Sequence, residues 1–142
     1  MSEKNYQALV KDRIFIGGAD DAKPAVENEK ADVVFDLRAE APKEPAEYNR
    51  IHSPIVEDKE GQEESIKNAI DSVLIAYEEG KKVYFHCGGG SNRTGTVAIG
   101  TLLGLGEASS IEEAEEKAQS IRPKIKVKPE MKEALKRLYP EA

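Results

Sequence analysis

The residues of this sequence that are best suited to do chemistry lie in one run, HCGGGSNRTG, at positions 86–95. The run contains the single cysteine of the chain, Cys87, and six positions later it contains Arg93. A cysteine thiolate is a strong nucleophile, and a guanidinium can grip two oxygens of one phosphate group. The glycines between them allow the backbone to turn tightly, so that its N–H groups can converge on an anion just before a helix begins. The pattern therefore predicts a nucleophilic cysteine within an anion-binding loop.

The positive field of such a loop should lower the pKa of Cys87 and keep the side chain as a thiolate. Thr94 is close enough in sequence to donate a hydroxyl hydrogen bond to the sulfur. The alternatives are that Cys87 is a small buried apolar residue and that Arg93 pairs with a surface carboxylate. The candidate substrate-binding positions are Gly88, Gly89, Gly90, Ser91, Asn92 and Arg93.

The sequence around the loop alternates between strand and helix patterns. Strands are predicted at 13–17, 31–37, 50–56 and 82–86, and the last of these runs directly into Cys87. Helices are predicted at 62–79 and 94–105, from Ser110 to about Arg122, and from Pro129 onward. This order predicts an α/β fold in three layers, with a mostly parallel central sheet of four to five strands flanked by helices. Ligands of such sheets bind at the carboxyl ends of the strands, which is where Cys87 lies.

Composition narrows the class of protein further. The chain has 142 residues, of which 39% are hydrophobic and 34% charged, as expected for one compact domain. Its net charge of −6 disfavours nucleic-acid binding driven by counterion release. No apolar run approaches the ~18 residues of a membrane span and no secretory segment is evident, so we expect no membrane association. The lone cysteine excludes an internal disulfide and indicates a reducing, cytoplasmic location, and we expect a monomer.

The loop resembles a known family motif. The run at 86–95 is similar to the H-C-x-x-G-x-x-R-[ST]-G loop of the cysteine-based protein tyrosine phosphatase superfamily, with Cys87, Gly90, Arg93 and Thr94 at its specified positions. Its place in the second half of the chain resembles the dual-specificity branch, of the small bacterial or atypical type. The resemblance implies a phosphatase-like three-layer fold, a single catalytic domain over residues 1–142, and a role for His86 in orienting the loop.

The resemblance also implies a general acid. In that family an Asp lies about thirty residues before the cysteine, and Asp58 lies 29 residues before Cys87, ahead of the most clearly periodic helix. Glu57 or Glu60 could serve instead, and the acidic run could also be only a solvated helix start. Asp36 and Arg38 are expected to form an ion pair or to brace the loop. We expect His52 to be an ordinary strand or surface residue.

The implied reaction is hydrolysis of a phosphomonoester through a cysteinyl-phosphate, without metal or cofactor. Cys87 attacks, Arg93 holds the phosphate oxygens, Asp58 protonates the leaving group, and His86 and Thr94 support the loop. The expected substrate is phosphotyrosine in a protein, with phosphoserine or phosphothreonine as further candidates. The alternatives are a phosphate-dependent binding module, a phosphatase of a small metabolite or inositol phosphate, and sulfur transfer or arsenate reduction.

One further segment, KIKVK, lies after the third predicted helix. Its lysines, Lys124, Lys126 and Lys128, alternate with Ile125 and Val127. This alternation predicts a charge-protected edge segment, and the alternative is recognition of an anionic substrate.

Overall fold

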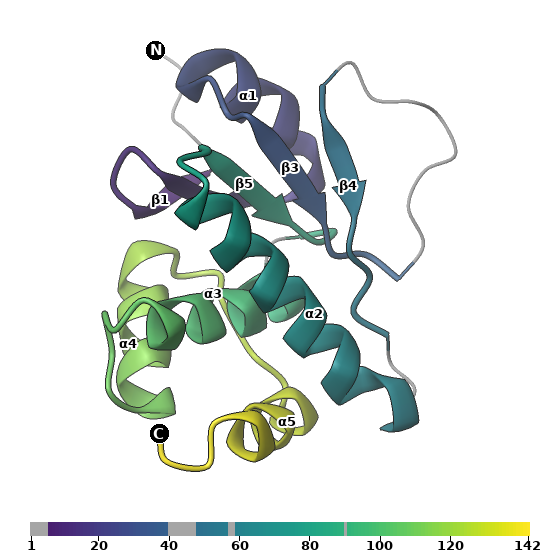
Figure 1. Cartoon of the computed structure of the whole chain (residues 1–142), viewed down its shortest axis with the longest axis vertical. Coiled ribbons are helices and arrows are strands. Elements are labelled where there is room, and N and C mark those ends of the chain that lie inside the picture. The colour runs from purple at the N-terminus through teal and green to yellow at the C-terminus, as the bar shows by residue number, and fades with distance from the viewer. Residues whose placement is uncertain (1–5, 40–47, 57–58, 90) are drawn as a thin grey trace.

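The computed structural model describes residues 6–39, 48–56, 59–89 and 91–142, with only the backbone of residues 59 and 60. A five-stranded sheet with the order β1-β2-β5-β3-β4 forms its centre (Figure 1). Only the β1–β2 pair is antiparallel among the described strands; β2–β5, β5–β3 and β3–β4 are parallel. The strands are β1 (Gln7–Val10), β2 (Ile14–Gly17), β3 (Val33–Asp36), β4 (Arg50–His52) and β5 (Val83–His86).

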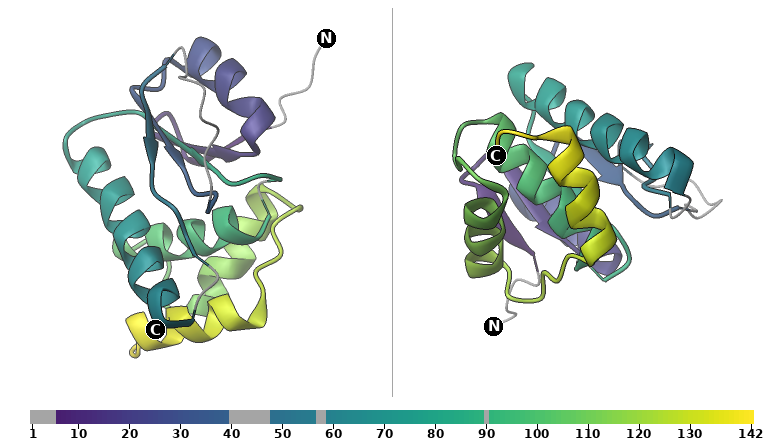
Figure 2. Two further views of the ribbon diagram at one scale, coloured as in Figure 1. Left: turned by 90° about the vertical axis from the view of Figure 1, so that its right-hand side faces the viewer. Right: turned by 90° about the horizontal axis from the view of Figure 1, so that it is seen from below.

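Helices cover both faces of this sheet. In the left view of Figure 2, α1 and α2 lie on opposite sides of the strands. Alternate residues of β5 explain this, because Val83 and Phe85 join the larger core while Tyr84 joins the smaller core under α1. The fold is therefore an α/β sandwich of three layers. The helices are α1 (Ala22–Glu29), α2 (Lys59–Glu78), α3 (Asn92–Gly104), α4 (Ile111–Ile121) and α5 (Pro129–Leu138), with a 3₁₀ turn, η1 (Ala19–Asp21).

The predicted fold class is confirmed, and most differences are local. β1 and α1 were not predicted from the sequence. The strand predicted at 50–56 ends at His52, and α3 begins two residues before the predicted position. No helix of the described chain is long and apolar enough to cross a bilayer.

The segment 124–128 is not a strand. Its alternation has another cause: Ile125 and Val127 are buried, and the three lysines are exposed. Both apolar side chains pack on Gly95 of α3, where a Cβ would lie 2.6 Å from Ile125 Cγ2. The glycine thus allows this segment to run close beside the start of α3.

The sheet brings three strand ends together at one edge. Gly17 and Asp36 are the register partners of His86 in the two neighbouring strands. The chain therefore leaves β5 at Cys87 between the ends of β2 and β3, the position at which parallel sheets bind ligands.

Candidate active site

In the loop after β5, three consecutive backbone carbonyls make hydrogen bonds with groups from outside the loop's turn. His86 Nδ1 lies 2.9 Å from the Cys87 carbonyl, Ala19 N–H donates to the Gly88 carbonyl (3.0 Å), and Arg122 Nη2 donates to the Gly89 carbonyl (3.2 Å). In a planar trans peptide the N–H points opposite to the C=O. The amides of Gly88 and Gly89 therefore point away from the partners of the Cys87 and Gly88 carbonyls, as an anion cradle requires.

The helix that follows contributes its N-terminus. α3 begins at Asn92, and its N-cap residue, Ser91, makes no side-chain capping bond. First-turn N–H groups have no partner within a helix, so an uncapped start next to the loop offers them to an anion. The helix dipole adds positive potential at the same place.

The sulfur of Cys87 lies against the first turn of this helix. Thr94 Oγ1 donates to Cys87 Sγ at 3.2 Å, as expected from the sequence, and it accepts the Cys87 N–H at 3.0 Å. Thr94 is fully buried and Cys87 is 6% exposed. A hydroxyl that donates to sulfur stabilises a thiolate more than a thiol, because the acceptor carries the charge.

Arg93 connects the loop to a second segment of the chain. Its Nε donates to the carbonyl of Ile55 at 2.8 Å. Ile55 is fully buried between the end of β4 and the start of α2. Arg93 therefore holds the chain that leads toward positions 57 and 58.

From the sequence, Arg122 was predicted only to mark the approximate end of a helix, and its contact with the loop was not predicted. It is 3% exposed, and besides Gly89 it holds the side chain of Gln7 on β1 (2.7 Å). A second missed contact is Tyr84 Oη, which donates to the Gly18 carbonyl at 2.7 Å. Both contacts join residues far apart in the sequence, and no local pattern signals them.

The base of the site contains a buried His and an ion pair. Asp36 is fully buried and accepts a two-pronged interaction from Arg38, with Nε at 2.9 Å and Nη2 at 2.7 Å. Burial acts to raise the pKa of Asp36, but the hydrogen bonds from Arg38 outweigh it, so the pKa lies below its usual value. Burial lowers the pKa of His86. Because the partner of His86 Nδ1 is a carbonyl, Nδ1 must carry the proton of the neutral ring.

The remaining predicted residues have different positions. Asn92 Oδ1 accepts the N–H of Lys128 (2.9 Å), so this side chain holds the 124–128 segment beside the loop. His52 lies on β4, and its Nε2 is 2.6 Å from the Arg38 carbonyl. Gly90 and the three acid candidates, Glu57, Asp58 and Glu60, lie outside the residues or side chains that the structure describes.

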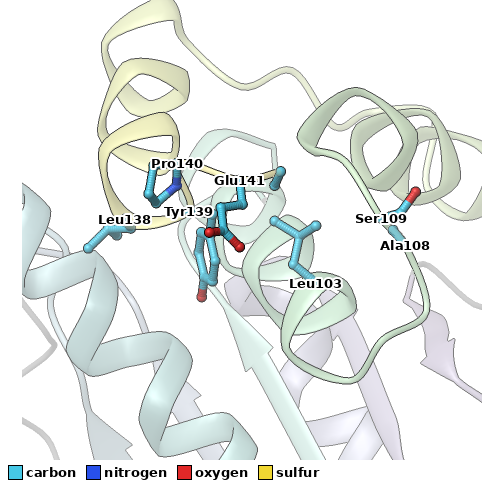
Figure 3. A pocket seen from close by; sticks show the side chains of 8 residues that line it. Leu103, Ala108, Ser109, Leu138, Tyr139, Pro140 and Glu141 are labelled. Atoms are coloured by element: carbon cyan, nitrogen blue, oxygen red, sulfur yellow. The ribbon is translucent and has the colours of Figure 1, made fainter.

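A separate cavity of ≈ 380 Å³ lies at the far end of the molecule. Figure 3 shows Leu103, Ser109 and Tyr139 around it, from α3, the α3–α4 connection and the end of α5. None of the described residues of the 86–94 loop lines this cavity. The cavity is therefore separate from the described part of the Cys87 loop.

Comparison with known proteins supports the same interpretation. The family model of the dual specificity phosphatase catalytic domain matches residues 14–140. The chain belongs to this family. Its members are cysteine-based phosphatases, and the predicted resemblance is confirmed. No curated protein matches the sequence.

Solved structures show the same fold at low sequence identity. A human DUSP28 variant matches with a TM-score of 0.80 and 16% identity, covering 99% of this chain and 100% of that one. Tk-PTP in its active form matches with a TM-score of 0.78 and 23% identity, at 99% and 100% coverage. PTPMT1 in complex with PI(5)P has a TM-score of 0.78 and 19% identity, with 96% of both chains covered.

Proposed function

We propose that this chain, as one monomeric catalytic domain, hydrolyses phosphomonoesters through a cysteinyl-phosphate, with phosphotyrosine in proteins as its preferred substrate. The observation that carries the proposal is the geometry of the loop. Three consecutive carbonyls, at positions 87–89, make hydrogen bonds on the side away from the expected anion, and the Cys87 sulfur accepts a hydrogen bond from a hydroxyl. This arrangement suits a phosphate dianion in line with Sγ. The family description, dual specificity phosphatase, supports the choice of a phosphorylated protein as substrate.

In the first step, Cys87 Sγ attacks phosphorus and the bond to the ester oxygen breaks. The loop amides at positions 88–92 and the Arg93 guanidinium hold the equatorial oxygens, where negative charge is spread in the transition state. Asp58 gives its proton to the departing oxygen. His86 supports this step only by fixing the loop, because its ring proton is committed to the Cys87 carbonyl.

In the second step, water attacks phosphorus and the S–P bond breaks. Asp58, now a carboxylate, accepts the proton from water, and Cys87 leaves as a thiolate. Thr94 supports this step, because its hydroxyl donates to the sulfur on which charge develops. The products are inorganic phosphate and the free alcohol or phenol, and no step uses a metal.

An inositol phosphate is the second candidate substrate. PTPMT1, which has the same fold, has been solved with PI(5)P bound. The loop of this chain, Gly-Gly-Gly-Ser-Asn between Cys87 and Arg93, contains no lysine to pair with a second phosphate of such a ligand. We therefore place the protein substrate first.

The test is hydrolysis of p-nitrophenyl phosphate in EDTA by wild type, Cys87→Ser and Asp58→Asn, followed by phosphotyrosine peptide, phosphoserine peptide and PI(5)P. Loss of activity in Cys87→Ser is expected on every substrate. Asp58→Asn should lose about 10²–10⁴-fold on the phosphotyrosine peptide and less on p-nitrophenyl phosphate, whose leaving group needs little protonation. Glu57→Gln and Glu60→Gln are the matched controls and should retain activity. Tight phosphate binding without turnover by wild type would instead identify a phosphate-dependent binding module.

A further inference from the structure

Two polar side chains of α2 hold one residue just before the acidic run. Val56 N–H donates to Ser65 Oγ (3.1 Å), and the Val56 carbonyl accepts from Gln62 Nε2 (3.3 Å). Ser65 Oγ in turn donates to the Gln62 carbonyl (2.8 Å). Gln62 is only 6% exposed, so its amide is placed in the interior with the Val56 carbonyl as its partner. Gln62 and Ser65 are three positions apart, so they share one face of the helix.

The chain before Val56 is fixed from other directions. Ser53 N–H donates to the Asp36 carbonyl (2.9 Å), and Ile55 N–H donates to the Leu37 carbonyl (3.1 Å). The Ile55 carbonyl accepts from Arg93 Nε. The segment 53–56 is thus bonded to the end of β3, to the candidate phosphate-binding arginine, and to α2. The bonds from α2 are the last ones before position 57.

We propose that Gln62 and Ser65 are positioning residues for the general acid. They fix both polar groups of Val56, two residues before Asp58, and so set where the chain enters the acidic run. A proton donor must come within about 2.6–3.2 Å of its acceptor atom. A displacement of about 1 Å can cost on the order of 10²-fold in rate. The proposal rests on the proposed function, and specifically on Asp58 as the acid.

The same helix provides a matched control. Ser72 Oγ donates to the Asn68 carbonyl (2.9 Å), just as Ser65 Oγ donates to a carbonyl of its own helix. Ser72 makes no hydrogen bond to the described segment 53–56. Loss of the hydroxyl from Ser72 therefore reports only the effect on the helix.

The experiment compares phenyl phosphate with p-nitrophenyl phosphate. Phenolate is a poor leaving group that needs its proton from the acid, whereas p-nitrophenolate leaves with little help. A misplaced acid therefore lowers kcat/KM for phenyl phosphate much more than for p-nitrophenyl phosphate. The quantity measured is the ratio of kcat/KM for phenyl phosphate to kcat/KM for p-nitrophenyl phosphate. For Ser65→Ala and Gln62→Met we expect this ratio to fall about tenfold, and for Asp58→Asn we expect a larger fall. Alkylation of Cys87 by iodoacetate should be unchanged.

A conservative variant and thermal unfolding guard against simple misfolding. Ser65 borders a cavity of ≈ 390 Å³, which has room for an added methyl group. Ser65→Thr should therefore restore the ratio, and Ser72→Ala should leave it at the wild-type value. Each variant is checked by circular dichroism melting.

The outcomes distinguish failure of the positioning role from failure of Asp58 as the general acid. An equal effect of Ser65→Ala on both substrates, or none, overturns the positioning role if Asp58→Asn still shows the leaving-group dependence. The proposed function then stands. If Asp58→Asn shows no such dependence, Asp58 is not the acid, and this proposal falls with that assignment.

Discussion

Thr94 is the residue whose substitution tests the chemistry of the sulfur most directly. Its hydroxyl makes two bonds to Cys87, one to Sγ and one from the backbone N–H. Thr94→Val removes both bonds and keeps the shape of the side chain. Thr94→Ser keeps the hydroxyl and removes one methyl group.

The two lost bonds have different consequences. A hydrogen bond to a charged group contributes about 1.5–3 kcal/mol. The bond from Thr94 Oγ1 to Cys87 Sγ therefore matters most when Cys87 leaves phosphorus as a thiolate. At about 1.4 kcal/mol per factor of ten, hydrolysis of the cysteinyl-phosphate should slow by about 10–150-fold. The Cys87 N–H, left without its acceptor in a buried place, should cost about 1–3 kcal/mol of unfolding free energy.

Rapid-quench kinetics with p-nitrophenyl phosphate distinguish these effects. We expect Thr94→Val to release a burst of about one p-nitrophenol per active site before a slow steady state, because the intermediate accumulates. The matched control is Thr101→Val in the same helix, where the buried hydroxyl has no hydrogen-bond partner among the described residues. Thr101→Val should keep wild-type kinetics. Burst-free turnover by Thr94→Val within twofold of wild type would refute the role given to the hydroxyl.

Three further substitutions test the surroundings of the loop. Arg122→Met removes the donor to the Gly89 carbonyl, so the competitive inhibition constant of inorganic phosphate should rise about tenfold, equal to about 1.4 kcal/mol; unchanged inhibition would contradict the bracing role. Burial lowers the pKa of His86, so the unfolded chain binds its proton first and the unfolding free energy should fall as the pH drops below 6.5. Urea titrations at several pH values should show that the unfolding free energy of His86→Phe depends less steeply on pH than that of the wild type. An equally steep pH dependence would show that other groups cause it. Gly95→Ala places a methyl group 2.6 Å from Ile125 Cγ2 and should lower the free energy of unfolding, measured in urea, by about 1–3 kcal/mol. An unchanged urea midpoint would mean that the segment 124–128 moves aside freely.

The parts of the fold that sequence could predict are those with a local signal. The helix predicted at 62–79 has apolar residues at helical spacing, and α2 buries Ile66, Ile70 and Val73 from that set. The strand predicted at 82–86 is apolar because both its faces are covered. Ser110 caps the helix that was predicted to begin there, with Glu113 N–H donating to Ser110 Oγ at 3.1 Å, and Glu113 Oε1 accepts from the Ser109 N–H at 3.0 Å.

The parts that it missed have weak or conflicting local signals. α1 contains Pro24 near its start and ends at Glu29, and the C-cap residue that follows, Lys30, has a φ of 61°, a left-handed conformation usually given to glycine. No stop signal was therefore visible. β1 is four residues long and lies at the sheet edge, where only its pairing with β2 defines it. The Arg122–Gly89 contact depends on the fold as a whole and on no local pattern.

Arg93 shows why an acidic chain can place an arginine, and not a lysine, at this point. With a net charge of −6, the protein has no long-range attraction for a dianion, so affinity must arise from short contacts. A guanidinium has five N–H donors in a fixed plane, and here Nε is bonded to the Ile55 carbonyl. The two amino groups carry the other four donors in the same plane, and this fork matches two oxygens of one phosphate. A lysine has one nitrogen and cannot hold the segment before Val56 and a phosphate in this geometry. The same side chain thus links the anion cradle to the segment from which Asp58 must act.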